Sequence, residues 1–165
     1  MKNRTRLLPL TAIVLAGVSL WPRAGSARDN LAVAQAAIKA GDLHAAATEL
    51  HNAVRDDPQN PAARYELARV ELQLGDPVSA ERDVRAAEQH GYDVNKTLPL
   101  LGRALLAENR AADLLAQVQP KGRDPVLDSD ILVLRGEAQV RLGKIDDAKA
   151  SFQEAERLAP GELAP

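Results

Sequence analysis

A spacing of 34 residues runs through this chain and constrains its fold more than any other feature. Gly41, Gly75, Asn109 and Gly143 are separated by that interval three times in succession. Each follows a stretch of helix-forming residues, and Gly and Asn most readily adopt the left-handed conformation with which many helices end. The spacing therefore predicts a repeated unit of two antiparallel helices joined by a tight turn.

Small residues recur with the same spacing in three further columns. They are Ala34, Ala68, Gly102 and Gly136, then Ala46, Ala80 and Ala148, then Ala53, Ala87 and Ala155. Small side chains at fixed intervals let two helices approach closely, and a bulkier one would overpack the contact by roughly 1–3 kcal/mol. Only 2% of the residues are aromatic, and no long stretch alternates apolar with polar residues. An all-α fold of four helix pairs is therefore expected, with little material for a sheet.

The expected helices fill most of the chain. They span 31–40 and 43–56, then 61–75 and 77–91, then 95–108 and 111–118, and finally 128–142 and 145–159. Asn30 is the expected cap of the first helix, because its side-chain oxygen can accept from a free N–H group. The third pair is irregular: its second helix is short, Leu114 and Lys121 stand where other repeats have Ala, and 119–125 is expected to be a loop.

Residues 1–27 have the three parts of a secretory signal peptide. Lys2, Arg4 and Arg6 form a basic start, an apolar run follows, and Gly25 and Ala27 are the two small residues that signal peptidase requires. Cleavage after Ala27 would leave a solenoid over 28–160 and a tail of 161–165. The protein is then expected to be periplasmic or secreted.

The alternative is an inner-membrane anchor formed by residues 7–21. This apolar stretch is short, since a spanning helix needs about 20 residues. Leu15-Ala16-Gly17 resembles the start of a lipoprotein signal, but Val18 stands where the lipidated cysteine is required. No lipid anchor is therefore expected.

Composition argues against most kinds of chemistry. The chain has no cysteine and a formal net charge of −2, so thiolate metal sites and a nucleic-acid partner are not expected. His44 and His51 share a helix face without a third ligand, so no metal site is predicted. Phosphate-binding glycine loops and paired catalytic carboxylates across a cleft are also missing from the pattern. No catalytic residue and no cofactor is predicted, and the chain is expected not to be an enzyme.

The spacing, small columns and turns together resemble the tetratricopeptide repeat family over about 28–160. The resemblance implies a right-handed α-solenoid. A narrower likeness is carried, in order, by the segments 75–81 (GDPVSAE), 98–106 (LPLLGRALL) and 134–138 (LRGEA). These look like the N-terminal repeats of the tetratricopeptide lipoproteins that accompany PEP-CTERM/exosortase systems. That likeness implies an envelope protein linked to exopolysaccharide production or surface-protein sorting.

In this family the first helix of each pair lines a concave groove. The family's groove positions correspond here to Leu31, Gln35, Ile38, Lys39, Tyr65, Arg69, Leu72, Gln73, Arg103, Leu106, Glu137, Val140 and Arg141. Aliphatic contacts beside long donors suit an extended peptide or a helix of a partner protein. The function implied is a protein–protein interaction scaffold or assembly factor. The alternative is a non-catalytic regulatory module that binds a polysaccharide or an envelope enzyme.

A second contact surface is expected on the last helix. Phe152, Ala155 and Leu158 follow helical spacing, and Pro160 ends the helix before any polar capping helix. A solenoid end without a cap exposes apolar area that would otherwise stack on a further repeat. Self-association, or a partner docked on this helix, is therefore predicted.

Overall fold

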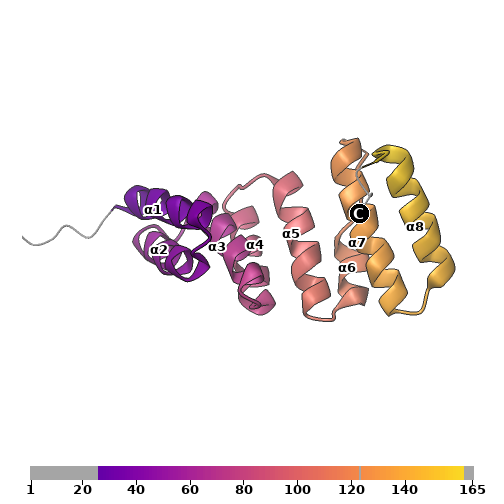
Figure 1. Ribbon diagram of the computed structural model, residues 1–165, viewed down its shortest axis with the longest axis horizontal. Helices are drawn as coiled ribbons and strands as arrows, with labels where there is room; N and C mark the ends of the chain where they lie inside the picture. Colours follow the sequence, from indigo (N-terminus) through magenta and orange to yellow (C-terminus); the bar gives the residue numbers. More distant parts are fainter. Residues whose placement is uncertain (1–25, 123, 162–165) are drawn as a thin grey trace, which may run out of the picture.

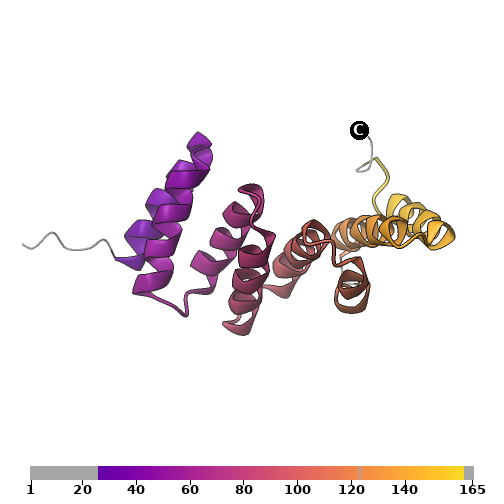
Figure 2. The same cartoon turned by 90° about the horizontal axis from the view of Figure 1, so that it is seen from below.

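The structure is a computed structural model that describes residues 26–122 and 124–161, and over those ranges it contains eight α-helices and no strand. The helices are α1 (Ala27–Ala40), α2 (Leu43–Asp56), α3 (Pro61–Gln73), α4 (Pro77–Gln89), α5 (Val94–Ala107), α6 (Ala111–Gln117), α7 (Pro125–Arg141) and α8 (Ile145–Leu158). They follow one another as pairs along the long axis of the molecule (Figure 1). Successive pairs are turned relative to each other (Figure 2). The expected all-α fold of four helix pairs is confirmed.

The turn inside each pair has the backbone conformation predicted from the 34-residue spacing. The φ angles are 77° at Gly41, 83° at Gly75, 60° at Asn109 and 72° at Gly143. Asn109 is the only residue other than glycine with positive φ in the described part of the chain. The four turns are therefore equivalent, and the repeat is present in the structure as well as in the sequence.

The columns of small residues lie where helices approach one another. Ala34, Ala46, Ala53, Ala68, Ala80, Ala87, Ala148 and Ala155 are all between 0% and 2% exposed. Gly102 and Gly136 are buried too, and a Cβ atom added to Gly102 would stand 3.0 Å from Cδ1 of Leu134. The prediction that these columns are contact positions is confirmed.

Two clusters of apolar side chains stabilise the stack. The smaller one joins α1, α2 and α3 around Leu50, Leu67 and Val70. The larger one extends from α3 to α7 and includes Leu105, Leu114 and Ile131, which are each fully buried. Each helix pair thus buries its apolar surface against the next pair, as expected of a solenoid.

The third pair is irregular, as the sequence predicted. Helix α6 has only seven residues, and α5 packs chiefly on α4 and α7 rather than on its own partner. Side chains of α7 stabilise the short helix α6 and the loop that follows it. Arg135 donates to the carbonyl oxygens of Leu115 and Val118 at 2.9 and 2.8 Å, and Asp128 accepts from the N–H groups of Lys121 and Gly122 at 2.8 and 2.6 Å.

Two helices begin earlier than predicted. Helix α7 starts at Pro125 rather than 128, because Asp124 caps it by accepting from the N–H groups of Val126 and Leu127. Helix α1 starts at Ala27 rather than 31, because Ser26 and Asp29 form a capping box.

Asn30, the residue expected to cap α1, therefore has another role. The Asn30 amide donates to Asp56 of α2 at 2.8 Å, so it joins the two helices of the first pair. The predicted cleavage point after Ala27 falls at the first residue of α1. Most of the predicted signal, 1–25, lies outside the described residues, and so does most of the predicted tail, at 162–165. The signal peptide and its cleavage remain predictions.

A partly buried cluster of charges joins α3 to α4. Asp83, which is 1% exposed, lies 2.5 Å from the guanidinium nitrogens of both Arg64 and Arg82. Oε1 of Glu71 is 3.5 Å from Arg82, while its other carboxylate oxygen is buried without a hydrogen-bond partner. Burial, reinforced by the negative charge of Asp83, raises the pKa of Glu71 to about 8.

Helix α8 does not present the apolar face that the sequence suggested. Ala155 is fully buried, and the Phe152 ring packs on Gly136 of α7 within the same pair. The exposed side chains of α8 are mostly polar or charged, and they include Asp146, Lys149 and Glu156. Phe152 and Leu158 are half-buried and Ala155 is buried, so docking on α8 remains a prediction. No helix in the described part of the chain is long and apolar enough to cross a bilayer.

Candidate ligand-binding groove

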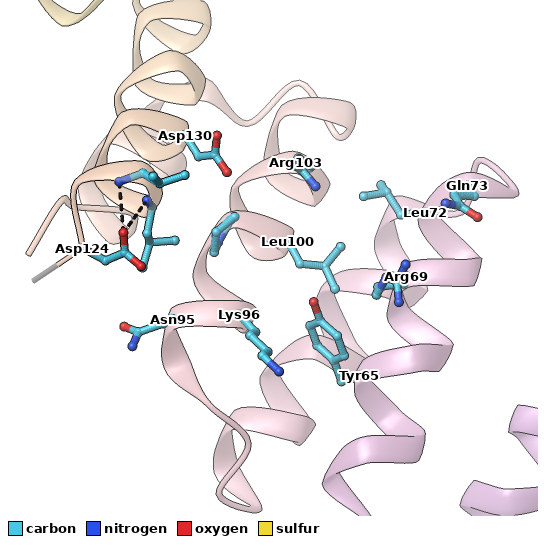
Figure 3. Close-up of a pocket in the computed structure, with 13 residues that line it drawn as sticks. Tyr65, Arg69, Leu72, Gln73, Asn95, Lys96, Leu100, Arg103, Asp124 and Asp130 are labelled. Carbon is cyan, nitrogen blue, oxygen red and sulfur yellow. Dashed lines mark hydrogen bonds between the residues drawn. The ribbon is translucent and has the colours of Figure 1, made fainter. Parts of the chain in front are cut away.

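A pocket of about 480 Å³ opens between the first helices of the second, third and fourth pairs. Figure 3 shows side chains of α3, α5 and the start of α7 surrounding this hollow. Its lining residues are Tyr65, Arg69, Leu72, Gln73, Asn95, Lys96, Pro99, Leu100, Arg103, Asp124, Val126, Leu127 and Asp130. We call this site the groove pocket.

Helices α3 and α5 each line the pocket with residues that lie on one face of the helix. On α3 the lining positions are 65, 69, 72 and 73, and on α5 they include 96, 99, 100 and 103. Positions separated by three, four or seven residues lie on one side of an α-helix. Each helix therefore shows a continuous stripe to the pocket while its opposite face packs in the core.

The third wall is the first turn and a half of α7. Hydrogen bonds of Asp124 and Asp128 fix the start of this helix and the loop before it. Asp124 caps the helix, and Asp128 fixes the preceding loop by accepting two backbone hydrogen bonds. Val126 is 52% exposed and lines the pocket, although a large aliphatic side chain is usually buried. An apolar side chain of a ligand would gain contact area there.

The floor of the pocket is apolar. Leu72 is half-buried, Pro99 is buried and Leu100 is 6% exposed. Tyr65 forms one side, and its ring stacks on Tyr92 with the centroids 4.4 Å apart and the planes 21° apart. Burial raises the pKa of the Tyr65 hydroxyl, so this group is a neutral hydrogen-bond donor at physiological pH.

Charged side chains surround the floor. Arg69 forms an ion pair with Glu66 of the same helix at 2.8 Å. Lys96 and Arg103 are exposed on α5, and Asp124 and Asp130 are exposed on α7. The combination of an apolar floor with long donors and acceptors can bind a segment of polypeptide through anchored side chains and charge-assisted hydrogen bonds.

The structure brings together five of the residues that the sequence placed in the groove: Tyr65, Arg69, Leu72, Gln73 and Arg103. The others do not line this pocket. Leu31 and Ile38 pack against the small core cluster, and Gln35 and Lys39 are exposed elsewhere on α1. Whether the five bind a ligand remains a prediction.

One predicted groove residue belongs to the core. Leu106 is 4% exposed, packs in the large cluster and does not line the groove pocket. Its carbonyl oxygen accepts a hydrogen bond from Arg141. Glu137, Val140 and Arg141 are exposed on α7, but they lie beyond the turns of that helix that line the pocket.

Sequence reasoning missed eight of the lining residues: Asn95, Lys96, Pro99, Leu100, Asp124, Val126, Leu127 and Asp130. Those on α5 could have been found by counting back three, four, seven and eight residues from Arg103. Asp130 could have been found in the same way, seven residues before Glu137, but Asp124, Val126 and Leu127 could not, because the helix was expected to begin only at 128.

No group of three or more His, Cys, Asp and Glu side chains suited to a metal ion occurs among the residues that the structure describes. His44 and His51 are exposed on α2. The groove pocket contains no histidine or serine, and its titratable groups are Tyr65, three cations and two carboxylates. Its side chains are therefore suited to binding by contact and charge.

Residues 37–93 match the family model described as tetratricopeptide repeat. The chain has the tetratricopeptide repeat fold. MamA MSR-1, at 15% identity, superposes with a TM-score of 0.70 over 82% of this chain and 78% of that one. YrrB, described as a TPR protein with an unusual peptide-binding site, gives 0.66 at 18% identity over 83% and 71%. PilF of Pseudomonas aeruginosa also gives 0.66, at 23% identity over 82% and 63%.

These likenesses establish the right-handed α-solenoid expected from the tetratricopeptide spacing. Tetratricopeptide repeat proteins act as scaffolds for protein–protein interaction, and no enzyme family is indicated for this chain. A comparison with curated proteins found no match.

Proposed function

We propose that this protein is an exported interaction module whose groove pocket binds a segment of a partner protein. The observation that carries the proposal is the convergence of α3, α5 and α7 on one hollow with an apolar floor and a charged rim. Peptide recognition commonly combines apolar anchors with hydrogen bonds that fix the orientation of the segment. The protein would thus act as a scaffold or assembly factor rather than as a catalyst.

The finer proposal places this activity in the bacterial envelope, in exopolysaccharide production or exosortase-linked surface-protein sorting. It is supported by the signal-like residues 1–27 and by the likeness of segments 75–81, 98–106 and 134–138 to exosortase-associated repeat proteins. N-terminal sequencing of the protein from periplasmic and membrane fractions tests the export. A chain that begins at Arg28 in the periplasm is expected, and an intact N-terminus in the membrane fraction would support the anchor at 7–21.

The alternative ligand, a polysaccharide, is less well supported. Sugar sites usually present open aromatic faces, and Tyr65 is the only aromatic side chain in the groove pocket. One face of its ring is already covered by Tyr92. A polypeptide ligand uses the aliphatic floor and the charged rim more fully.

We also propose that two copies of the protein associate through a second surface, separate from the groove pocket. The side chains available for it are Val140, Leu142 and Ile145 at the turn between α7 and α8, which are 49%, 42% and 61% exposed. Light scattering of the mature protein, with Ile145→Glu as the variant, would detect it. A monomer at high concentration in both proteins would remove this second contact and leave the groove unaffected.

Selection of short random peptides displayed on phage, with the full chain as bait, tests the groove. The pocket variant carries Leu72→Asp and Arg103→Glu, and the control is Arg157→Glu on α8, where the side chain is 67% exposed. Selected peptides should bind the wild type and the control equally and the pocket variant at least about tenfold more weakly, because an anchor and a charge-assisted bond are both lost. Equal binding to all three proteins would contradict the proposed site.

A further inference from the structure

The charges around the groove pocket are sorted by helix. The cations Arg69, Lys96 and Arg103 stand on α3 and α5, and the carboxylates Asp124 and Asp130 stand on α7. Figure 3 shows the two carboxylates at one side of the pocket, Arg69 at the opposite side, and Lys96 and Arg103 on α5 between them. The pocket therefore has a basic side and an acidic side that share an apolar floor.

Three of these charges are available to a ligand. Lys96, Arg103 and Asp130 are exposed, and they form no ion pair and no side-chain hydrogen bond with any residue that the structure describes. The other two are already engaged. Arg69 pairs with Glu66, and Asp124 accepts from the two N–H groups that it caps. Each side of the pocket thus retains at least one free charge.

Free charges of opposite sign on two sides of a pocket discriminate between ligands. A ligand charge that meets its opposite is attracted, while a like charge in the same place is repelled at a cost that can reach several kcal/mol. A uniformly acidic segment would satisfy Lys96 and Arg103 but would meet Asp130. A uniformly basic segment would be attracted by Asp130 but repelled by Lys96 and Arg103. Specificity here therefore depends on the repulsive contacts as well as on the attractive ones.

We propose that the groove pocket selects a partner segment in which an acidic and a basic side chain flank an apolar one. The apolar side chain packs on Leu72, Leu100 and Val126. The acidic side chain binds Lys96 and Arg103, and the basic one binds Asp130. The order of the two charges fixes the direction in which the segment lies. This inference rests on the proposed function and specifies the ligand of the same site.

The test is a second selection from the same phage-displayed random peptides, with a charge-swapped full chain as bait. The swap is Arg103→Asp together with Asp130→Arg, and both positions are exposed, so we expect the fold to be retained. Peptides selected by the wild type should carry the acid–apolar–base pattern in one order. Peptides selected by the swapped chain should carry the charges in reverse.

One selected peptide and its charge-exchanged counterpart then give a quantitative readout. The wild type should bind the selected order roughly tenfold more tightly, and the swapped chain should prefer the exchanged order by a similar factor. Lys96→Glu, a single exposed change, should weaken binding of the selected order and serves as a second variant if the double swap does not fold.

The outcomes separate this inference from the function on which it rests. Equal affinity for the two peptides, an unchanged preference in the swapped chain, or selection of uniformly acidic peptides would overturn the charge pattern while the groove remains a binding site. Failure to select any peptide would contradict the proposed function and this inference with it.

Discussion

The Phe152 ring lies so close to Gly136 that a Cβ atom added to Gly136 would be 2.5 Å from Cε1 of the ring. Gly136 is on α7 and Phe152 on α8, so the contact joins the two helices of the last pair. No real Cβ atom approaches a carbon so closely. The glycine in the repeat column is therefore required by the one aromatic residue that faces it.

This relationship predicts that the effect of Gly136→Ala changes sign with the residue at 152. In the wild type the added methyl group should destabilise the fold, because overpacking by roughly 1–3 kcal/mol exceeds the gain of about 1 kcal/mol from replacing a helical glycine. In a Phe152→Ala background only the helical gain remains, and the same change should stabilise. Urea unfolding of the four proteins measures both effects. Equal effects in the two backgrounds would show that the Phe152 ring is not the reason why residue 136 is a glycine.

The second small column predicts a larger loss at Ala80. This residue is fully buried on α4, so Ala80→Leu should lower the free energy of unfolding by roughly 1–3 kcal/mol through overpacking. Val78→Leu on the same helix is the matched control, because Val78 is 66% exposed. Thermal melts of both variants decide the point. Similar melting temperatures would mean that the column is not a close contact.

The short helix α6 should depend on Arg135. Its guanidinium donates to the carbonyl oxygens of Leu115 and Val118, so Arg135→Met should destabilise the fold by roughly 1–3 kcal/mol and speed hydrogen exchange in α6. Arg157→Met is the control, because Arg157 pairs with Glu154 at an exposed site where little stability is expected. Unchanged exchange in α6 would argue that this helix is stable without the arginine.

Stability should fall as the pH rises, because of Glu71. Its pKa is raised from 4.5 to about 8 in the folded protein, so the folded state binds the proton more tightly than the unfolded state does. The loss therefore begins near pH 4.5, grows up to about pH 8 and is constant above it, and it is on the order of a few kcal/mol. Melting temperatures across this range measure it.

Glu71→Gln is the variant that isolates this effect. The neutral amide cannot ionise, so the decline should flatten and the variant should be more stable than the wild type above pH 8. Glu66→Gln on the same helix is the control, since Glu66 pairs with Arg69 and should leave the decline in place. An unaltered pH profile in Glu71→Gln would assign the decline to another group.

The fold could be predicted because two independent sequence signals describe the same backbone. Gly41, Gly75, Asn109 and Gly143 mark turns that need positive φ, and the small columns mark contacts that need short side chains. Both requirements are local and steric, so they are visible in the residue types. The helix starts were less predictable, because Ser26 and Asp124 cap their helices through short-range hydrogen bonds that several nearby residues could have formed.

The groove was predicted only in part for a related reason. Tyr65, Arg69 and Arg103 lie on faces that follow directly from the repeat. The α7 side of the pocket depends instead on the irregular third pair, whose loop is positioned by Asp128 across six and seven residues. A regular repeat pattern cannot give that position, and it does not distinguish Leu106, which packs in the core, from the residues that line the pocket.

Hydrogen–deuterium exchange of the full chain, with and without a peptide selected by it, tests the central claim most directly. Binding in the groove pocket should slow exchange in α3, α5 and the first turns of α7, while α2 and α8 remain unchanged. The Leu72→Asp, Arg103→Glu variant should show no protection at the same peptide concentration. Protection confined to α2, α4 or α8, or protection that persists in this variant, would contradict the account.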